Sequence, residues 1–256
     1  MNVKVELKNG YFKSNLCLKD RLIDTAYKEF ISKDFTYKKT YLQKKYNYGF
    51  DGYSYIGQKD SSNQYAEDLL HSFVISEFSD PKTFPKEFQP FLKHQWTYLT
   101  DKIKQVELKI LESLNIDNKK DIIRFHEQYI GYMKSMNYYP ANINNEAKKY
   151  RLSKHKDVSL ITVFPFGISK GLFLIDEHNQ EVAVEASHNL IAFPGYLMEC
   201  LTYGKIKGIE HSVKFNPKNQ DKRFSYAVFS IPFPCENLPI LRSSSQSYFQ
   251  CYLSLF

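Results

Sequence analysis

The chain contains 256 residues, of which 43% are hydrophobic and 25% charged, a balance that excludes a disordered or low-complexity protein. Its net charge of +7 would suit an anionic partner, but the lysines are scattered in pairs, so we expect a solvated surface and no nucleic-acid partner. No apolar run approaches the ~18 residues of a membrane span, and charged residues interrupt the N-terminal segment. We therefore expect a cytoplasmic protein without a membrane partner, and we expect it to be a monomer.

The cysteines are expected to be reduced thiols. No two of them form a CxxC pair, which excludes a zinc ribbon or a thioredoxin-like motif. Without a secretory signal, their even number does not argue for disulfides. The four are Cys17, Cys200, Cys235 and Cys251.

Helical patterns dominate residues 1–130. Apolar residues between Leu22 and Ile31 fall on one face and predict a helix over about 18–32. Residues 38–62 are rich in Tyr, Gly, Asp and Asn, and we expect irregular chain there with a strand near 52–56. Apolar residues at three- and four-residue steps predict one long amphipathic helix over about 85–114, and a shorter helix follows over 117–128.

From residue 129 onward, short β-type runs alternate with turn residues. The predicted strands cover residues 132–139, 158–166, 171–175, 182–184, 190–193, 210–215 and 224–231. Many short strands at this spacing predict a β-barrel or sandwich. The fold class is therefore α+β, with a helix-rich region over 1–130 and a jelly-roll core over 131–234 in one domain, 1–256. The tail over 243–256 has no clear pattern.

The first candidate chemistry is a metal site. Alternate side chains of a strand share a face, so His155 and Asp157 would point the same way and could hold one metal ion. His211, on a separate predicted strand, is the candidate third ligand. Two histidines and one carboxylate leave three metal positions open, as in non-haem Fe(II) oxygenases. The His-x-Asp tripeptide alone is a weak motif.

The remaining histidines are interpreted as surface or capping residues. They are His71, His94, His126, His178 and His188. A second candidate site follows His211 along the chain. Arg223 and Ser225 would share one strand face, where a guanidinium and a hydroxyl form a binding site for a carboxylate.

An ordered series of segments resembles the isopenicillin-N-synthase-like group of Fe(II)/2-oxoglutarate-dependent oxygenases. The order and spacing hold from about Tyr132 to Pro234, and residues 9–12 resemble the opening of the family more loosely. The matching segments are Asn137-Tyr138-Tyr139-Pro140, His155-Lys156-Asp157 with Leu160-Ile161-Thr162-Val163, Gly171-Leu172-Phe173-Leu174, Thr202-Tyr203-Gly204, His211-Ser212-Val213 and Arg223-Phe224-Ser225.

This resemblance implies a double-stranded β-helix with helices packed outside it. His155, Asp157 and His211 would bind Fe(II) as the catalytic centre. The far carboxylate of 2-oxoglutarate would pair with Arg223 and Ser225, and O2 would be the oxidant. The implied reaction oxidises a small-molecule substrate, by hydroxylation, with release of succinate and CO2; desaturation and ring closure are family variants.

Two further positions are implied to bind the co-substrate. Asn137 and Tyr139 fall where relatives contact the iron-chelating end of 2-oxoglutarate, which favours an enzyme that uses it. The alternative is an oxidase resembling isopenicillin N synthase, which keeps the triad and the Arg-x-Ser pair but uses no 2-oxoglutarate. A non-catalytic or nucleic-acid-binding protein on this scaffold is a different class, and it would need no intact triad.

Departures from the family pattern concern the pocket rather than the ligands. Ser212 stands where relatives usually carry Arg, Phe166 where Gln is frequent, and Tyr203 replaces the usual Asn. These residues bear on the shape of the pocket and hence on the substrate, which the sequence does not identify. The expected pocket-lining residues are aromatic residues from the first 80 positions together with Phe164, Phe166, Phe173, Tyr226 and Phe233.

Overall fold

The computed structural model describes residues 3–8, 10–19, 22–46, 50–62, 65–141, 150–176, 178–214 and 221–233. Asn9, Pro234, Cys235, Cys251 and the tail over 243–256 therefore lie outside the described residues. The described cysteines, Cys17 and Cys200, are free thiols, as predicted. No helix of the described chain is both long and apolar enough to cross a membrane.

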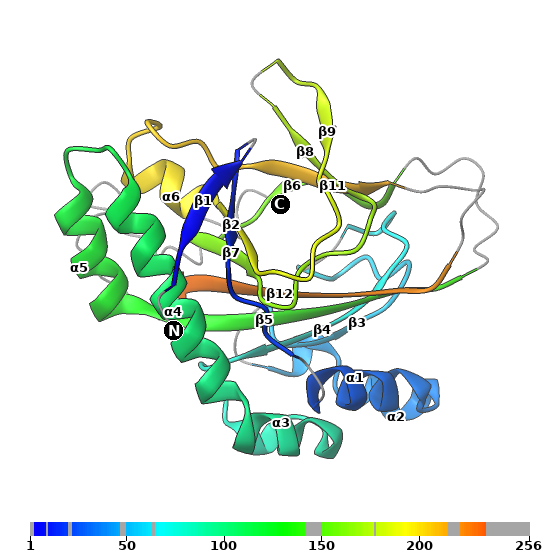
Figure 1. The fold of residues 1–256 in the computed structure, drawn as a ribbon. Coiled ribbons are helices and arrows are strands. Elements are labelled where there is room, and N and C mark those ends of the chain that lie inside the picture. Colours follow the sequence, from blue (N-terminus) through cyan, green and yellow to red (C-terminus); the bar gives the residue numbers. More distant parts are fainter. Residues whose placement is uncertain are drawn as a thin grey trace.

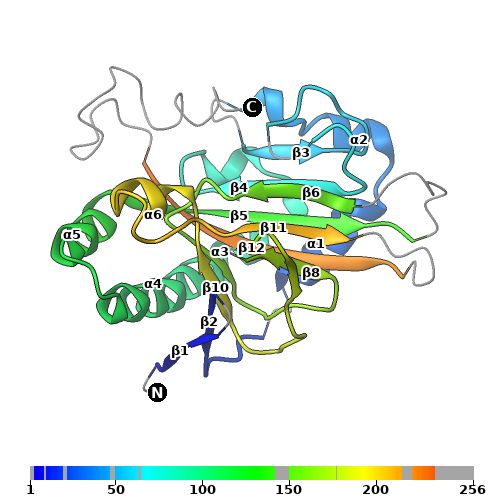
Figure 2. The ribbon, with the colours of Figure 1, turned by 90° about the horizontal axis from the view of Figure 1, so that it is seen from above.

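Two antiparallel sheets form the centre of the molecule (Figures 1 and 2). The large sheet has the strand order β1-β2-β10-β7-β12-β5-β4-β3, and the small sheet has the order β6-β11-β8-β9. The strands of the large sheet are β1 (Val5–Lys8), β2 (Tyr11–Ser14), β3 (Gly52–Ser54), β4 (His71–Ser76), β5 (Ile130–Tyr139), β7 (Ile161–Phe164), β10 (Ile191–Pro194) and β12 (Arg223–Pro232). The strands of the small sheet are β6 (Tyr150–Lys156), β8 (Leu172–Ile175), β9 (Glu181–Ala183) and β11 (Glu210–Lys214).

The helices at residues 22–39 and 89–94 lie on the face of the large sheet away from the small sheet, whereas those at 119–129 and 196–201 lie at one end of the sheets (Figure 1). Together with the two antiparallel sheets, they fit a jelly-roll fold. The helices are α1 (Leu22–Ser32), α2 (Phe35–Lys39), α3 (Gln89–His94), α4 (Trp96–Ser113), α5 (Lys119–Tyr129) and α6 (Tyr196–Leu201). Short 3-10 turns, η1 (Gln43–Lys45), η2 (Pro81–Thr83) and η3 (Lys86–Phe88), connect these elements.

Each of the seven predicted strands has a counterpart within a few residues, whereas β1, β2, β4 and β6 were not in the predicted set. The pattern of β4 explains why it was missed. Five of its six residues are buried, so the strand lacks the polar–apolar alternation that marks a half-exposed strand. The helices near 18–32 and 117–128 are confirmed as α1 and α5.

The prediction of one long helix over 85–114 was wrong. The chain breaks at Gln95, whose backbone lies at φ −128° and ψ −25°, and α3 and α4 are separate helices. In a continuous helix, residues five positions apart point about 140° away from each other. The break lets Phe91 and Trp96 both face the core, with ring centroids 5.7 Å apart.

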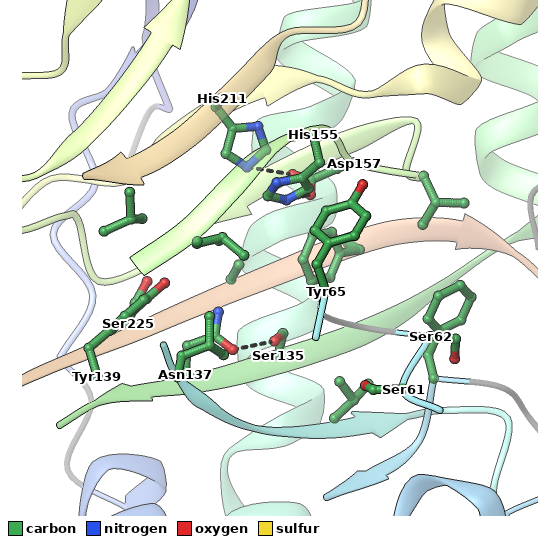
Figure 3. Close-up of a pocket in the computed structure, with 18 of the residues that line it drawn as sticks. Ser61, Ser62, Tyr65, Ser135, Asn137, Tyr139, His155, Asp157, His211 and Ser225 are labelled. Atoms are coloured by element: carbon green, nitrogen blue, oxygen red, sulfur yellow. Dashed lines mark hydrogen bonds and ion pairs between the residues drawn. The ribbon is translucent and has the colours of Figure 1, made fainter. Parts of the chain in front are cut away.

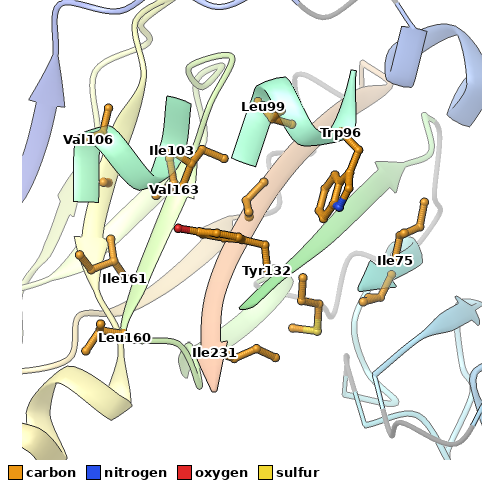
Figure 4. Close-up of a cluster of buried hydrophobic side chains, with 14 of the residues drawn as sticks. Ile75, Trp96, Leu99, Ile103, Val106, Tyr132, Leu160, Ile161, Val163 and Ile231 are labelled. Atoms are coloured by element: carbon orange, nitrogen blue, oxygen red, sulfur yellow. The ribbon is translucent and has the colours of Figure 1, made fainter. Parts of the chain in front are cut away.

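The apolar face of α4 packs against the large sheet (Figure 4). Leu99, Ile103 and Val106 are almost completely buried there, and they belong to the same cluster as Tyr132 and Val163 of the sheet. Strand alternation then directs the neighbouring residues of β5 and β12 to the opposite face. That opposite face is one wall of the cavity described below.

The prediction that His126 lies at the surface was also wrong. Its imidazole is buried between α4 and α5, and Nε2 lies 2.7 Å from Glu107 Oε2. Tyr132 donates a hydrogen bond of 2.9 Å to the same carboxylate oxygen. A polar helix residue can therefore face the core when it has buried partners. His71 is half-buried, and its Nδ1 lies 2.8 Å from the hydroxyl of Tyr53.

Candidate active site

Two histidines and one aspartate converge at the small sheet. His155 lies near the end of β6, Asp157 follows that strand directly, and His211 lies on β11. Pairing of the two strands places His211 directly opposite His155. Asp157 Oδ1 is 3.3 Å from His155 Nε2, and Asp157 Oδ2 is 3.6 Å from His211 Nε2. The candidate ligand atoms all lie within 4.8 Å of one another, so one metal ion could contact all three (Figure 3).

The hydrogen bonds of the imidazoles leave the metal-facing nitrogens available. His155 Nδ1 lies 2.8 Å from the carbonyl oxygen of Ser153, and His211 Nδ1 lies 3.2 Å from that of Ile209. A carbonyl oxygen only accepts, so each Nδ1 is the donor. In a neutral imidazole, Nε2 then carries the free lone pair and points toward Asp157. Such bonds orient the histidine ligands of metal sites.

A chain of hydroxyl groups fixes the carboxylate of Asp157. Thr162 donates to Asp157 Oδ2 at 2.7 Å, and the hydroxyl of Ser159 lies 2.7 Å from that of Thr162. Gly195 packs against this group so tightly that a Cβ there would lie 2.2 Å from the Ser159 carbonyl oxygen. The hydroxyl of Thr162 therefore holds the carboxylate through Oδ2, with Oδ1 toward His155 and Oδ2 toward His211.

The electrostatics of Asp157 and His211 suit metal ligation. Burial by itself would raise the pKa of Asp157, but the imidazoles of His211 and His155 hold it below its usual value. Burial lowers the pKa of His211 to about 4, and the neighbouring His155 acts in the same direction. For His155, burial lowers the pKa, but the hydrogen bond to Asp157 and its charge outweigh this and raise it. An ionised carboxylate and a neutral imidazole are the forms that bind metals.

A buried aspartate that the sequence analysis missed supports the first histidine. Asp68 Oδ1 accepts hydrogen bonds from the backbone N–H and the hydroxyl of Ser153, at 2.8 and 2.7 Å. The carbonyl of Ser153 is in turn the acceptor for His155. Asp68 is 1% exposed and lies far from β6 in the sequence. No motif marks such a residue, because only the folded chain brings it to the strand.

The triad borders a cavity of about 460 Å³ between the two sheets, which also contains Arg223 and Ser225. Both residues line it from β12, as strand alternation predicted. Arg223 Nε donates to the hydroxyl of Ser169 at 2.8 Å. Its Nη1 is buried without a hydrogen-bond partner among the described residues. A buried guanidinium nitrogen without an acceptor fits an incoming carboxylate.

Asn137 and Tyr139 also line the cavity, from β5. In the β5–β12 ladder, Tyr139 pairs with Arg223 and Asn137 pairs with Ser225. The guanidinium carbon of Arg223 lies 5.3 Å from the centre of the Tyr139 ring. The sequence comparison put both residues at the iron-chelating end of the co-substrate. Figure 3 shows Tyr139 and Ser225 on the side of the cavity away from the triad, and contact of Asn137 and Tyr139 with the co-substrate stays a prediction.

Only Phe164, of the five predicted pocket aromatics, lines the cavity. Phe166 and Tyr226 pack on the other side of the sheet, where the Lys134 ammonium lies 4.5 and 5.3 Å from their ring centres. Phe173 packs under the ammonium of Lys214, and Phe233 is partly exposed beside Phe78. Phe50 and Tyr65, aromatic residues of the first 80, also line the cavity, as expected. The sequence analysis missed Lys59, Ser61, Ser62, Ala66 and Phe229 as lining residues.

Residues 131–232 match the family model of the 2OG-Fe(II) oxygenase superfamily. No curated protein sequence matches the chain. Among solved structures, the chain is similar to JOX2 in complex with 2OG, Fe and JA, with a TM-score of 0.71 and 22% identity over 96% of this chain and 77% of that one. It is also similar to a full-length Neurospora crassa protein in complex with alpha-KG, with a TM-score of 0.69 and 19% identity over 96% and 86% of the two chains.

A third similar structure is the dioxygenase for auxin oxidation 1 from Arabidopsis thaliana in its binary complex with 2-oxoglutarate. Its TM-score is 0.62, with 13% identity over 84% of this chain and 78% of that one. The TM-scores of these three structures establish a shared fold. The family match covers the strands that carry His155, Asp157 and His211, and this cluster fits an iron site. Residues 131–232 therefore match a 2OG-Fe(II) oxygenase domain, and the His-Asp-His cluster within them supports a 2-oxoglutarate- and Fe(II)-dependent oxygenase.

Proposed function

We propose that this oxygenase hydroxylates a small-molecule substrate inside the cavity between its two sheets, releasing succinate and CO2. One observation carries the proposal: a complete His-Asp-His cluster opens into the same cavity as Arg223, whose buried Nη1 has no acceptor among the described residues. The two groups match the two ends of 2-oxoglutarate, which can chelate a metal at one end and pair with a guanidinium at the other.

His155, Asp157 and His211 would hold Fe(II) and leave its other positions open to the cavity. When bound, iron and 2-oxoglutarate supply the oxidising power of the reaction with O2. The protein side of the chemistry is positioning. The Ser153 and Ile209 carbonyls orient the imidazoles, and Thr162 orients the carboxylate. We assign the triad residues the catalytic role on these contacts.

Arg223 and Ser225 would bind the far carboxylate of 2-oxoglutarate. Tyr139 lies beside the guanidinium of Arg223 and would also contact this carboxylate. Asn137 lines the cavity from the same strand and accepts a hydrogen bond from the hydroxyl of Ser135. Burial strengthens each of these contacts because it removes competing water. The clamp would therefore hold the co-substrate in one orientation relative to the triad.

The rest of the wall supports a small, partly apolar substrate. Aliphatic and aromatic side chains from both sheets line the cavity beside the triad, and its volume of about 460 Å³ fits a small molecule. The crystallised complexes of similar proteins contain JA in JOX2 and thymine in the Neurospora crassa protein. Apolar walls also exclude water from the site of C–H oxidation.

We also propose that residues 1–256 act as one catalytic domain whose jelly-roll core, 131–234, is a double-stranded β-helix. The facing of the two sheets across the site supports this. Strands β1–β4 of region 1–130 extend the large sheet, and the helices of that region would pack outside the core. The monomeric state, the cytoplasmic location and the absence of a nucleic-acid partner stay predictions.

The test is the anaerobic addition of Fe(II) and then 2-oxoglutarate to the purified apo-protein, followed by visible absorption. A weak charge-transfer band of the chelate is expected, and it should be absent in His211→Ala. Iron binding without the band would favour the oxidase alternative that uses no 2-oxoglutarate. Failure to bind iron would overturn the proposal. The assay requires no knowledge of the substrate.

A further inference from the structure

We propose that the substrate is a small organic acid with an apolar body, and that Lys59 binds its carboxylate. The inference rests on the proposed function and deepens it by naming a substrate class and a specificity-determining residue. It starts from the charges that face the cavity.

Few charged side chains line the cavity in the described chain. Asp157 is the only carboxylate there, and Lys59 and Arg223 are the only lysine and arginine. An Fe(II) ion and Arg223 would carry three positive charges together, and Asp157 with dianionic 2-oxoglutarate would carry three negative charges. These groups balance one another. Lys59 then remains as the uncompensated charge of the loaded cavity, and a substrate with one negative charge would neutralise it.

Lys59 differs from the other lysines near the site. Lys156 lies 2.8 Å from a carboxylate oxygen of Glu199, and Lys154 lies 3.5 Å from one of Glu181. Lys59 is exposed and has neither a hydrogen bond nor an ion pair with another described residue. Asp60 follows it in the sequence but does not line the cavity. The ammonium of Lys59 is therefore available to a ligand.

Lys59, Ser61 and Ser62 lie where they could contact the substrate rather than the co-substrate. Figure 3 shows Ser61 and Ser62 on the side of the cavity away from Tyr139 and Ser225, with the triad above and between the two ends. Lys59 precedes the two serines by a short stretch of chain and lines the same cavity. An acid held by Lys59 would extend its other end toward the triad.

Apolar side chains also line the cavity away from Tyr139. Phe50, Val74 and Met133 are among them, Val74 pairs with Ser135 in the β4–β5 ladder, and the ring of Tyr65 lies edge-on to that of His155 at 6.4 Å. Such a surface can contact the hydrocarbon part of a ligand, but it offers no counter-charge or hydrogen bond to a second charged group on that ligand. An amine would be repelled by Lys59, and a neutral amide would leave the ammonium without a counter-charge.

The test compares near-isosteric ligands that differ in charge. Phenylacetate, phenylacetamide and phenethylamine form one set, and hexanoate, hexanamide and hexylamine form a second set with an aliphatic body. Binding is measured by ligand-observed NMR, without oxygen, on protein saturated with Fe(II) and 2-oxoglutarate so that the Arg223 clamp is filled. We expect an acid to bind about tenfold more tightly than its amide, with the amine weakest.

Variants of Lys59 attribute the preference to its charge. Lys59→Ala should reduce acid binding to the level of the amide, Lys59→Arg should retain the preference, and Lys59→Glu should reverse it in favour of the amine. Lys120→Ala, at an exposed position on α5, is the control for the overall positive charge of the protein and should change nothing.

Two results would overturn the inference: neither acid binds more tightly than its amide, or the preference survives in Lys59→Ala. The absorption band of the Fe(II)–2-oxoglutarate chelate is recorded on the same samples. If the band is intact and the acid preference is absent, the substrate class is wrong while the proposed function stands. If the band is missing from the wild-type protein, both proposals fail.

Discussion

His155 and His211 are direct register partners across the β6–β11 ladder, and their ring centroids lie 4.3 Å apart. Two opposite residues in an antiparallel pair share one face of the sheet. The ladder therefore presents two imidazoles side by side without help from a loop. Asp157 follows β6 directly, and its carboxylate lies 3.3 Å from His155 Nε2, which completes the cluster.

Removal of one imidazole should abolish the retention of iron. We expect His211→Ala to weaken Fe(II) binding by about 100-fold or more, since even partners of metal ligands contribute 10–100-fold. Metal content after anaerobic gel filtration measures this. The matched control is His188→Ala, at an exposed position, and it should bind iron as the wild type does. Wild-type iron content in His211→Ala would remove this residue from the metal site.

Asp68 should affect iron binding without touching the metal. Loss of its carboxylate in Asp68→Ala leaves Ser153 without its acceptor, and the bond that orients His155 is weakened. We expect Fe(II) affinity to fall about tenfold, with partial recovery in Asp68→Asn, which keeps one acceptor oxygen. A competition titration with a chelating dye measures the affinity. The exposed Asp60→Ala is the control, and an unchanged affinity in Asp68→Ala would contradict the assignment.

The guanidinium of Arg223 should determine the co-substrate requirement. In Arg223→Leu, the 2-oxoglutarate concentration that half-saturates the absorption band should rise about 100-fold, since a paired charged contact is lost. Fe(II) binding should remain. Ser169→Ala removes only the hydrogen bond to Arg223 Nε and should raise the requirement a few-fold. Equal 2-oxoglutarate binding in wild type and Arg223→Leu would refute the clamp.

His71 should make the fold less stable in mild acid. Burial lowers its pKa to about 4, with the charge of Lys38 acting in the same direction, while an unfolded histidine titrates near 6.5. Below pH 6.5, the unfolded chain therefore binds a proton that the folded chain rejects, and stability falls as the pH drops toward 4. The full loss is about 3 kcal/mol relative to a variant that cannot titrate there.

Urea unfolding of wild type and His71→Asn at pH 8, 6 and 4.5 checks this dependence. The free energy of unfolding of the wild type, measured relative to that of His71→Asn, should decrease as the pH falls. His94→Asn, at an exposed position, should keep a constant difference from the wild type over the same range. A pH-independent difference between wild type and His71→Asn would show that His71 does not carry the effect.

The sequence by itself determined which residues share a face. Strand periodicity predicted that Arg223 and Ser225 point into one space, and the His-x-Asp pattern with His211 predicted the ligand set. Helices α1 and α5 were also predictable, because each has a local amphipathic repeat. These features depend on side-chain spacing within one element, and a short stretch of sequence contains that information.

Only the tertiary structure decided which elements meet. The pairing of β6 with β11, the support of Ser153 by Asp68 and the placing of Lys59 at the cavity all join residues distant in sequence. The break at Gln95 and the burial of His126 against Glu107 have the same origin. Each follows from how whole surfaces are buried together, which is a property of long-range packing rather than of local periodicity.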